Sequence, residues 1–154
     1  MEPSLRPATR NDLVAVREIV RTAYSHYIAR IGHEPGPMLD DYQALIDAGR
    51  VTVAEGDGIV QGLLVLMPQG DEMLLDNVAV APAAQGMGLG RLLMRFAEKM
   101  AIEAGHRSIR LYTNEAMVEY IKLYKRNGYV ETHRVEEKGL RRIYMRKQLQ
   151  LVIA

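Results

Sequence analysis

Cysteine is missing from the 154-residue sequence, and so are long apolar runs. Without cysteine the protein has no disulfides, no thiolate metal ligands and no cysteine nucleophile. No apolar stretch approaches the ~20 residues that a membrane-spanning helix needs, and the first residues, MEPSLRPATRNDL, lack a basic segment followed by an apolar one. We therefore expect a cytoplasmic protein with no membrane contact, whose chemistry uses oxygen, nitrogen or backbone groups.

Metal-binding spacings and a strong net charge are missing as well. No HExxH or similar spacing joins the four histidines, so we expect no metal site. The formal net charge of +1 argues against nucleic-acid binding as the main role. The charge is nevertheless uneven: residues 1–77 hold 6 Lys/Arg and 12 Asp/Glu, whereas residues 78–154 hold 14 and 7. This is either scattered surface charge, or an acidic side that attracts a cationic substrate beside a basic side that holds a polyanion.

The composition, 48% hydrophobic and 25% charged, fits one globular domain, which we place at residues 1–154. Thr9 and Asp12 form a capping start for the first helix. Apolar periodicity and turn residues predict strands at 5–7, 51–55, 59–67, 72–80, 108–113, 129–135 and 141–149, and helices at 13–27, 40–48, 88–104 and 117–127. Strands interspersed with helices predict a three-layer α/β/α fold with a mixed central sheet of about six to seven strands.

The segment VAVAPAAQGMGLGRLLM, residues 78–94, leads from a strand into a helix and has glycine at 86, 88 and 90. The free amides and positive dipole of a helix start bind phosphate, and missing side chains leave room for it. Alternatively, the turn needs glycine only for its dihedral angles. A Walker loop does not fit, because Arg91 and Leu92 follow Gly90; a Rossmann turn does not fit, because the next glycine is at 105.

Two motifs match a known family. Residues 85–90, QGMGLG, form a Gln-x-x-Gly-x-Gly turn, and residues 123–129, LYKRNGY, read Leu-Tyr, three residues, Gly-Tyr. Together they resemble the signatures of the GNAT superfamily of N-acetyltransferases, and the order of the expected elements fits this family over nearly the whole chain. The resemblance implies a GNAT-like acyl-CoA N-acyltransferase fold, with acetyl-CoA as the acyl donor.

The resemblance also implies where the cofactor binds. The backbone of residues 78–80 would bind the pantetheine arm between two splayed strands, and the amides of residues 86–91 would bind the pyrophosphate. Arg91 either pairs with a phosphate or lies on the exposed helix face. The implied cofactor-binding residues are Val78, Ala79, Val80, Gln85, Gly86, Met87, Gly88, Leu89, Gly90, Arg91, Asn114 and Tyr124.

Tyr124 matches the proton donor of the family. An amine attacks the thioester directly, and a phenol can protonate the thiolate as it leaves. Alternatively Tyr120 and Tyr124, four residues apart, are core aromatics of one helix.

The base that removes a proton from the amine is less defined. Asp76 and Glu72 share one side of the strand at 72–80 because their spacing is even, and we take Asp76 as the catalytic carboxylate. Glu72, Tyr112 and His33 are further candidates, and each carboxylate could instead be an ordinary solvated one.

Two positions at which this sequence differs from related enzymes bear on the choice of acceptor. In the family's ribosomal-protein alanine acetyltransferases a glutamate occupies the position of Tyr112, and an asparagine that contacts the cofactor occupies that of Met117. The lack of both argues against a protein N-terminal substrate and against this asparagine contact, for which Asn114 is a nearby substitute. The proline-rich loop at 31–38 could wall a pocket for a small amine. We expect acetyl transfer to a primary amine of a small molecule. The alternatives are a non-catalytic acyl-CoA-binding sensor and acetylation of protein lysine or N-terminal amines.

The apolar tail LQLVIA, residues 149–154, is the remaining feature. It could extend the last strand or contribute to a homodimer, which is a common arrangement in this family.

Overall fold

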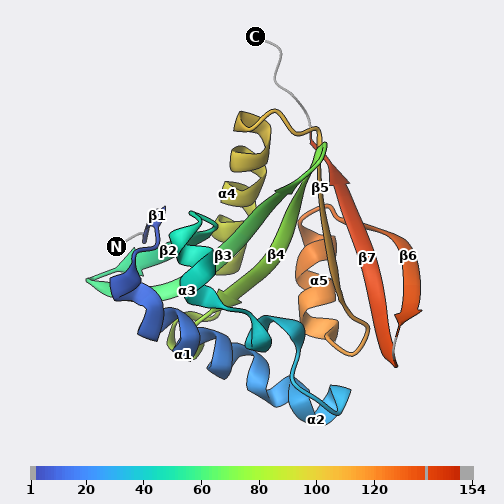
Figure 1. Ribbon diagram of the computed structural model, residues 1–154, viewed down its shortest axis with the longest axis horizontal. Helices are drawn as coiled ribbons and strands as arrows, with labels where there is room; N and C mark the ends of the chain where they lie inside the picture. Colours follow the sequence, from blue (N-terminus) through green and yellow to red (C-terminus); the bar gives the residue numbers. More distant parts are fainter. Residues whose placement is uncertain (1–2, 138, 150–154) are drawn as a thin grey trace.

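The computed structural model describes residues 3–137 and 139–149, so most of the apolar tail lies outside the described residues. Its centre is a seven-stranded sheet in the order β1-β2-β3-β4-β5-β7-β6, in which β4 and β5 are parallel and the other neighbours antiparallel (Figure 1). The strands are β1 Ser4–Pro7, β2 Val51–Gly56, β3 Ile59–Gln69, β4 Glu72–Val80, β5 Ser108–Asn114, β6 Val130–Glu137 and β7 Leu140–Gln148. The expected mixed sheet is confirmed.

The helices are α1 Leu13–Tyr24, α2 Ile28–Ile31, α3 Tyr42–Asp47, α4 Leu89–Glu103 and α5 Val118–Arg126. The first helical segment is longer than expected: after Tyr24 it passes through a 3₁₀ turn at Ser25–Tyr27 into α2, and it ends where Gly32 takes a left-handed conformation. The loop at 31–38 contains part of a further 3₁₀ turn, Gly36–Leu39. None of the helices in these described ranges is long and apolar enough to cross a membrane.

Three layers follow from the alternation of side chains along the strands. On β3, Leu64 packs in one buried cluster with Leu93 of α4, whereas Leu63 and Val65 pack in another with Val16 of α1. Because neighbouring strand residues point to opposite faces, α1–α3 cover one face and α4 and α5 the other. Figure 1 shows α1–α3 on the side toward the viewer. The expected three-layer arrangement is confirmed.

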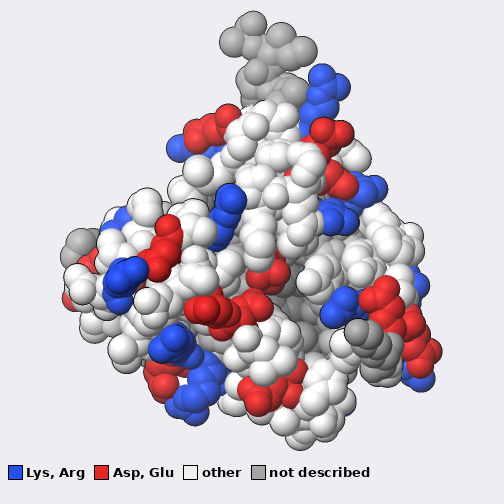
Figure 2. Space-filling view, viewed as in Figure 1, with Lys and Arg blue, Asp and Glu red and all other residues white. Residues whose placement is uncertain are grey.

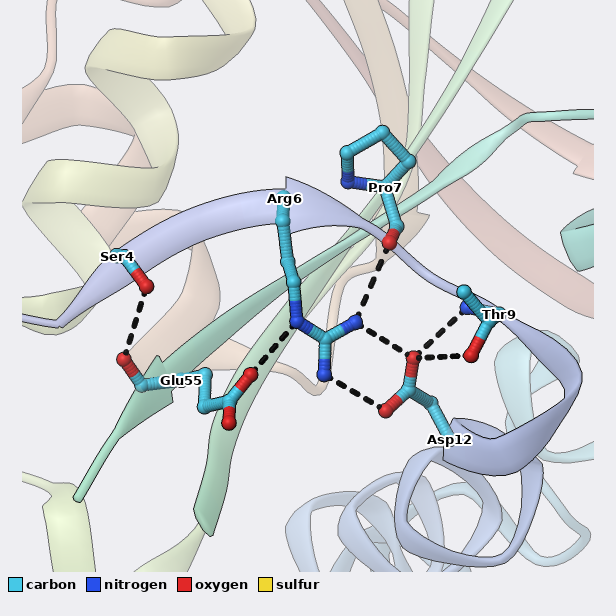
Figure 3. A network of polar contacts seen from close by, with 6 residues as sticks. All are labelled: Ser4, Arg6, Pro7, Thr9, Asp12 and Glu55. Carbon is cyan, nitrogen blue, oxygen red and sulfur yellow. Dashed lines mark hydrogen bonds and ion pairs between the residues drawn. The ribbon is translucent and has the colours of Figure 1, made fainter. Parts of the chain in front are cut away.

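A polar network fastens the first strand to the first helix (Figure 3). Arg6 of β1 donates to Glu55 of β2 at 2.6 Å and to both carboxylate oxygens of Asp12 at 2.8 and 2.9 Å. Asp12 also accepts the backbone amide of Thr9 at 2.7 Å, as the expected capping start requires. The network therefore fixes where α1 begins relative to the sheet edge.

The strands β4 and β5 separate after a short contact. They pair only at Met73–Ile109 and Leu74–Arg110, although β4 continues to Val80 and β5 to Asn114. In Figure 1 the two strands diverge toward the lower part of the molecule. The register of β4 against β3 also shifts at Asp76, which has no partner between Leu75 and Asn77. The expected separation of β4 from β5 is present, and the β-bulge at Asp76 lies close to the point where the two strands begin to separate.

Candidate functional site

The three glycines of the turn before α4 have different structural reasons. Gly86 and Gly88 adopt φ values of 81° and 78°, where a residue with a side chain is strained. Gly90 does not lie in this region, and a Cβ there would meet only Leu123 of α5, at 3.7 Å. The backbone therefore requires glycine at 86 and 88 but not at 90, where the missing side chain leaves open surface beside the helix start.

Unpaired amides gather at this turn. Within the described ranges, the backbone N–H groups of Gly86, Met87 and Gly88 have no hydrogen-bond partner. The first amides of α4, from Leu89, are unpaired because no helical turn precedes them, and Gly88 supplies no capping side chain. Free amides at the positive end of a 15-residue helix form a site suited to a phosphate or diphosphate.

A first pocket, the turn-side pocket, lies next to the glycine turn and has a volume of about 250 Å³. Val78 and Val80 of β4 form one wall, and Tyr120 and Leu123 of α5 form another. Because Leu123 also faces the position of a Gly90 side chain, the pocket adjoins the start of α4. It is lined by Ala23, His26, Tyr27, Val78, Val80, Gln85, Glu119, Tyr120 and Leu123.

The β4 backbone beside this pocket partly contacts side chains already. The carbonyl of Val78 accepts the Tyr24 hydroxyl at 2.9 Å, and that of Val80 accepts the Gln85 side chain at 3.4 Å. Ala79 is buried on the opposite, α1-facing side of the sheet. Of these three strand residues, only Val78 and Val80 line the pocket with their side chains.

Tyrosines of α1 and α5 contact one another beside the turn-side pocket. Tyr120 of α5 stacks on Tyr24 of α1 with ring centroids 5.2 Å apart. Tyr124, one turn further, has its ring centroid 6.1 Å from that of Tyr120 and is only 6% exposed. Burial raises the pKa of Tyr120 to about 12 and that of Tyr124 well above its usual value of 10, so both are neutral near pH 7. Tyr120 lines the turn-side pocket, and Tyr124 lies behind it.

A second pocket, the loop-side pocket, has a volume of about 530 Å³ and lies between the loop after α2, the middle of β4, the end of β5 and the start of β7. Met117, just before α5, lines it, whereas Glu119 and Tyr120 line the turn-side pocket. Likewise Asp76 of β4 lines the loop-side pocket and Val78 the turn-side pocket. The two pockets are therefore neighbours along β4 and the first turn of α5.

Two carboxyl groups meet in the loop-side pocket. Asp76, at the bulge of β4, and Asp40, just before α3, both line it. Burial, together with the nearby Asp40 carboxylate, raises the pKa of Asp76 from 3.8 to about 7. A carboxylate with such a pKa can accept a proton near neutral pH and release it again.

The other candidate bases lie in different surroundings. Glu72 pairs with Arg146 at 2.7 Å and accepts the Ser108 hydroxyl at 2.8 Å, and the Arg146 contact lowers its pKa. It does not line either pocket. Tyr112 and His33 do line the loop-side pocket. The even spacing on β4 therefore does not bring Glu72 to the site.

Most of the expected cofactor-binding residues do not line the turn-side pocket. Asn114 lines the loop-side pocket, and its side-chain oxygen accepts the amide of Ala116 at 2.9 Å. Arg91 lines a separate surface hollow at the start of α4, together with Arg95 and with Met87, Gly88 and Leu89 of the turn. Of the expected set, the structure thus brings Val78, Val80 and Gln85 to the turn-side pocket, and it brings Met87, Gly88, Leu89 and Arg91 to the separate hollow.

Sequence patterns missed Asp40 and Arg142 of the loop-side pocket. Asp40 precedes Asp41, whose side chain caps α3 by accepting the Ala44 amide, so the pair looks like an ordinary helix start. Arg142 lies in the basic run of residues 141–147 and has no motif around it. Only the arrangement of strands and loop brings these two residues to Asp76.

Known proteins share this architecture. The acetyltransferase (GNAT) domain profile matches residues 47–131, more than half of the chain. A comparison with curated protein sequences found no match. Ribosomal-protein-alanine N-acetyltransferase from Brucella melitensis is 26% identical, with a TM-score of 0.77 over 95% of this chain and 99% of that chain. The YncA acetyltransferase from Salmonella typhimurium, whose structure contains its cofactor acetyl-CoA, is 21% identical, with a TM-score of 0.74 over 100% and 98%.

The PaiA N-acetyltransferase from Thermoplasma acidophilum, in complex with coenzyme A, is 18% identical, with a TM-score of 0.75 over 96% of this chain and 99% of that chain. These likenesses concern the fold, whereas the domain profile covers the glycine turn and the Leu-Tyr motif themselves. The chain belongs to the GNAT acetyltransferase family, which uses acetyl-CoA as its acetyl donor.

Proposed function

We propose that the protein transfers the acetyl group of acetyl-CoA directly to the primary amine of a small molecule. The supporting observation is the adjacency of the two pockets, since Asp76 and Val78 lie two residues apart on β4 and line different pockets. The donor would bind along the glycine turn and the turn-side pocket, and the acceptor would enter through the loop-side pocket. The thioester and the amine would then meet where β4 and β5 begin to separate.

In this proposal Asp76 is the general base. A primary alkylamine has a pKa of roughly 10 and is mostly protonated at neutral pH, so it must lose a proton before it attacks. With a pKa of about 7, Asp76 is half ionised near neutral pH and can take that proton, directly or through water. The nitrogen lone pair then forms the N–C bond to the thioester carbonyl.

Tyr124 is the proposed general acid. As the C–S bond breaks, the electron pair goes to sulfur, and the leaving thiolate is stabilised by a proton from the phenol. Burial keeps Tyr124 protonated at the pH of reaction. Its neighbour Tyr120 lines the turn-side pocket, whereas Tyr124 does not, so the two tyrosines must be compared by substitution.

A second candidate acceptor is a protein amine, because the similar Brucella protein is a ribosomal-protein-alanine N-acetyltransferase. Both positions at which this chain departs from such enzymes, Tyr112 and Met117, line the loop-side pocket. The Tyr112 departure therefore concerns the acceptor half of the proposed site, whereas the Met117 departure concerns an implied cofactor contact. A non-catalytic acyl-CoA sensor is the third candidate.

The test is a panel of amines incubated with acetyl-CoA and followed by release of the CoA thiol. The protein contains no cysteine, so a thiol reagent reports CoA alone. The panel should contain small primary amines, amino acids, lysine peptides and N-terminal alanine peptides. Turnover of a small amine supports the proposal, and turnover of peptides alone contradicts it. Background release in every case, with acetyl-CoA binding intact, supports the sensor.

A further inference from the structure

We propose that the acceptor is an amino acid or a similar zwitterion, and that Arg142 binds its carboxylate in the loop-side pocket. This inference rests on the proposed function, because it assigns the acceptor class to the same pocket. Its basis is the distribution of charge over the pocket walls. Acidic side chains come from the loop after α2 and from β4, and one guanidinium comes from β7 on the other side.

The acidic wall consists of Glu34, Asp40 and Asp76. A protonated amine entering the pocket is attracted to this wall, and Asp76 is also the proposed base. In the view of Figure 2 the surface is hollowed near its centre, with acidic side chains on the left of the hollow and a basic group on the right. The pocket therefore has two ends of opposite charge.

Arg142 is the one lysine or arginine among the described residues that line this pocket. It stands opposite Asn114 in the β5–β7 ladder, and its Cζ lies 4.9 Å from the centre of the Tyr112 ring. Its carboxylate partner in the described part of the chain is Glu137 at 3.5 Å, which does not line the pocket and whose side chain is 54% exposed. Such an exposed pair is weak, and a guanidinium has five N–H donors, so Arg142 retains donors for a second carboxylate.

The stacking on Tyr112 also orients these donors. A guanidinium that lies over an aromatic ring keeps the N–H groups at its edge free, and this edge matches the two oxygens of a carboxylate. Tyr112 lies between the two charged ends, because groups from both ends affect its pKa. Burial raises the pKa of Tyr112, Asp76 raises it further, and Arg142 lowers it. An acceptor held at both ends would therefore lie across Tyr112.

The same charges disfavour two other acceptor classes. A diamine or polyamine with its first amine at Asp76 would place a second cation near Arg142, where like charges repel. A simple alkylamine would leave Arg142 without a ligand partner. A zwitterion satisfies both ends, so the charge of the pocket selects for it.

The experiment compares pairs of acceptors that differ in one carboxylate. Suitable pairs are L-leucine with 3-methylbutylamine, and 4-aminobutyrate with propylamine, with L-ornithine and putrescine as a third pair. We measure kcat/KM for acetyl transfer, and we measure acceptor binding by calorimetry on protein saturated with CoA. For at least one pair the carboxylate should raise kcat/KM and affinity about ten-fold or more, as expected for a charge-assisted hydrogen-bonded pair.

The decisive variant is Arg142→Gln, with Arg141→Gln as its matched control. Arg141 precedes it on β7, does not line the pocket, and pairs with Glu115 at 3.1 Å. The Arg142 change should lower the preference for the carboxylated member of the pair about ten-fold, while the Arg141 change should leave this ratio unaltered. Equal loss in both variants would contradict the assignment.

Because acetyl transfer and acceptor binding are measured separately, a failure of this inference can be distinguished from a failure of the proposed function. If simple amines are acetylated as fast as their carboxylated partners, the proposed function stands and the zwitterion assignment is wrong. If nothing is acetylated but the amino acid binds through Arg142, the pocket assignment stands and the enzymatic proposal is wrong. If neither member of any pair binds or reacts, the zwitterion assignment is wrong.

Discussion

Asp40 and Asp76 face the same pocket from different parts of the chain, and the Asp40 carboxylate adds to the effect of burial in raising the pKa of Asp76 to about 7. Because Asp40 comes from a loop and Asp76 from a strand bulge, this relationship depends on the folded loop. It gives the loop after α2 a direct influence on the proposed base.

The first prediction concerns the pH profile of Asp40→Asn. Only ionised Asp76 can accept a proton, so kcat/KM of the unaltered protein should rise with pH through about 7. Removing the like charge lowers the pKa of Asp76. The rising part of the kcat/KM profile should therefore move to lower pH by roughly one unit. The measurement is kcat/KM from pH 5 to 9. Glu72→Gln is the control, because Glu72 pairs with Arg146 outside the pocket. If the rising part of the profile did not move in Asp40→Asn, the proposed effect of Asp40 on the pKa of Asp76 would be refuted.

The second prediction concerns Tyr124→Phe. Loss of the proton donor should lower kcat by about ten-fold or more, while the Kd for CoA and the midpoint of unfolding change little. Stopped-time assays and calorimetry measure these quantities. Tyr129→Phe is the control: its hydroxyl is buried, as is Tyr124, and has no partner among the described residues. If Tyr120→Phe abolished turnover while Tyr124→Phe did not, the role would belong to Tyr120.

The third prediction concerns Gly90→Ala. A methyl group there meets only Leu123 at 3.7 Å, so the fold should be kept, and alanine should favour the helix by up to about 0.5 kcal/mol. The same methyl group would obstruct a diphosphate on the free amides, so the Kd for CoA should rise about ten-fold.

Gly62→Ala provides the contrast to Gly90→Ala. Its Cβ would lie 3.1 Å from the Ala79 carbonyl oxygen and from Leu89, so it should lower the free energy of unfolding by about 1–3 kcal/mol. Calorimetry with CoA and urea unfolding distinguish the two substitutions. Unimpaired CoA binding by Gly90→Ala would show that the glycine at 90 does not serve the cofactor.

The fourth prediction concerns the network of Asp12. Hydrogen bonds from Arg6 are the largest cause that lowers the pKa of Asp12 from 3.8 to about 2. Because the folded pKa is the lower one, the stabilisation is present above pH 3.8 and is lost as the pH falls through about 2. Asp12→Asn should reduce the free energy of unfolding by about 1–2 kcal/mol at pH 7, and by progressively less from pH 4 to pH 2.

Urea unfolding at several pH values measures this effect. Asp47→Asn is the matched control, since Asp47 pairs with Arg10 on the surface at 3.0 Å and solvent screening should make the contribution of this pair much smaller. A loss for Asp12→Asn no larger than that of the control would contradict the structural role of the network.

Local patterns were sufficient for much of the molecule. Alternating apolar residues placed β2, β3, β4 and β5 within two residues of their observed bounds, and glycines after α4 and α5 marked the helix ends. The first helical segment was placed less well, because a 3₁₀ turn connects α1 to α2 without a proline or glycine to mark it. The segment continues to Ile31 and ends at Gly32, which takes a left-handed conformation.

The sequence by itself determined the glycine turn and the alternation that forms the sheet, because both depend on backbone geometry and on the type of each neighbouring residue. Tertiary structure alone decided that Asp40 and Arg142 line the same pocket as Asp76 and that Glu72 does not. The pocket is formed by a strand bulge, a loop and the strand β7, which lies beside β5. The charge of the proposed acceptor pocket is therefore a property of packing: electrostatic interaction depends on distance in space, which the spacing along a chain does not fix.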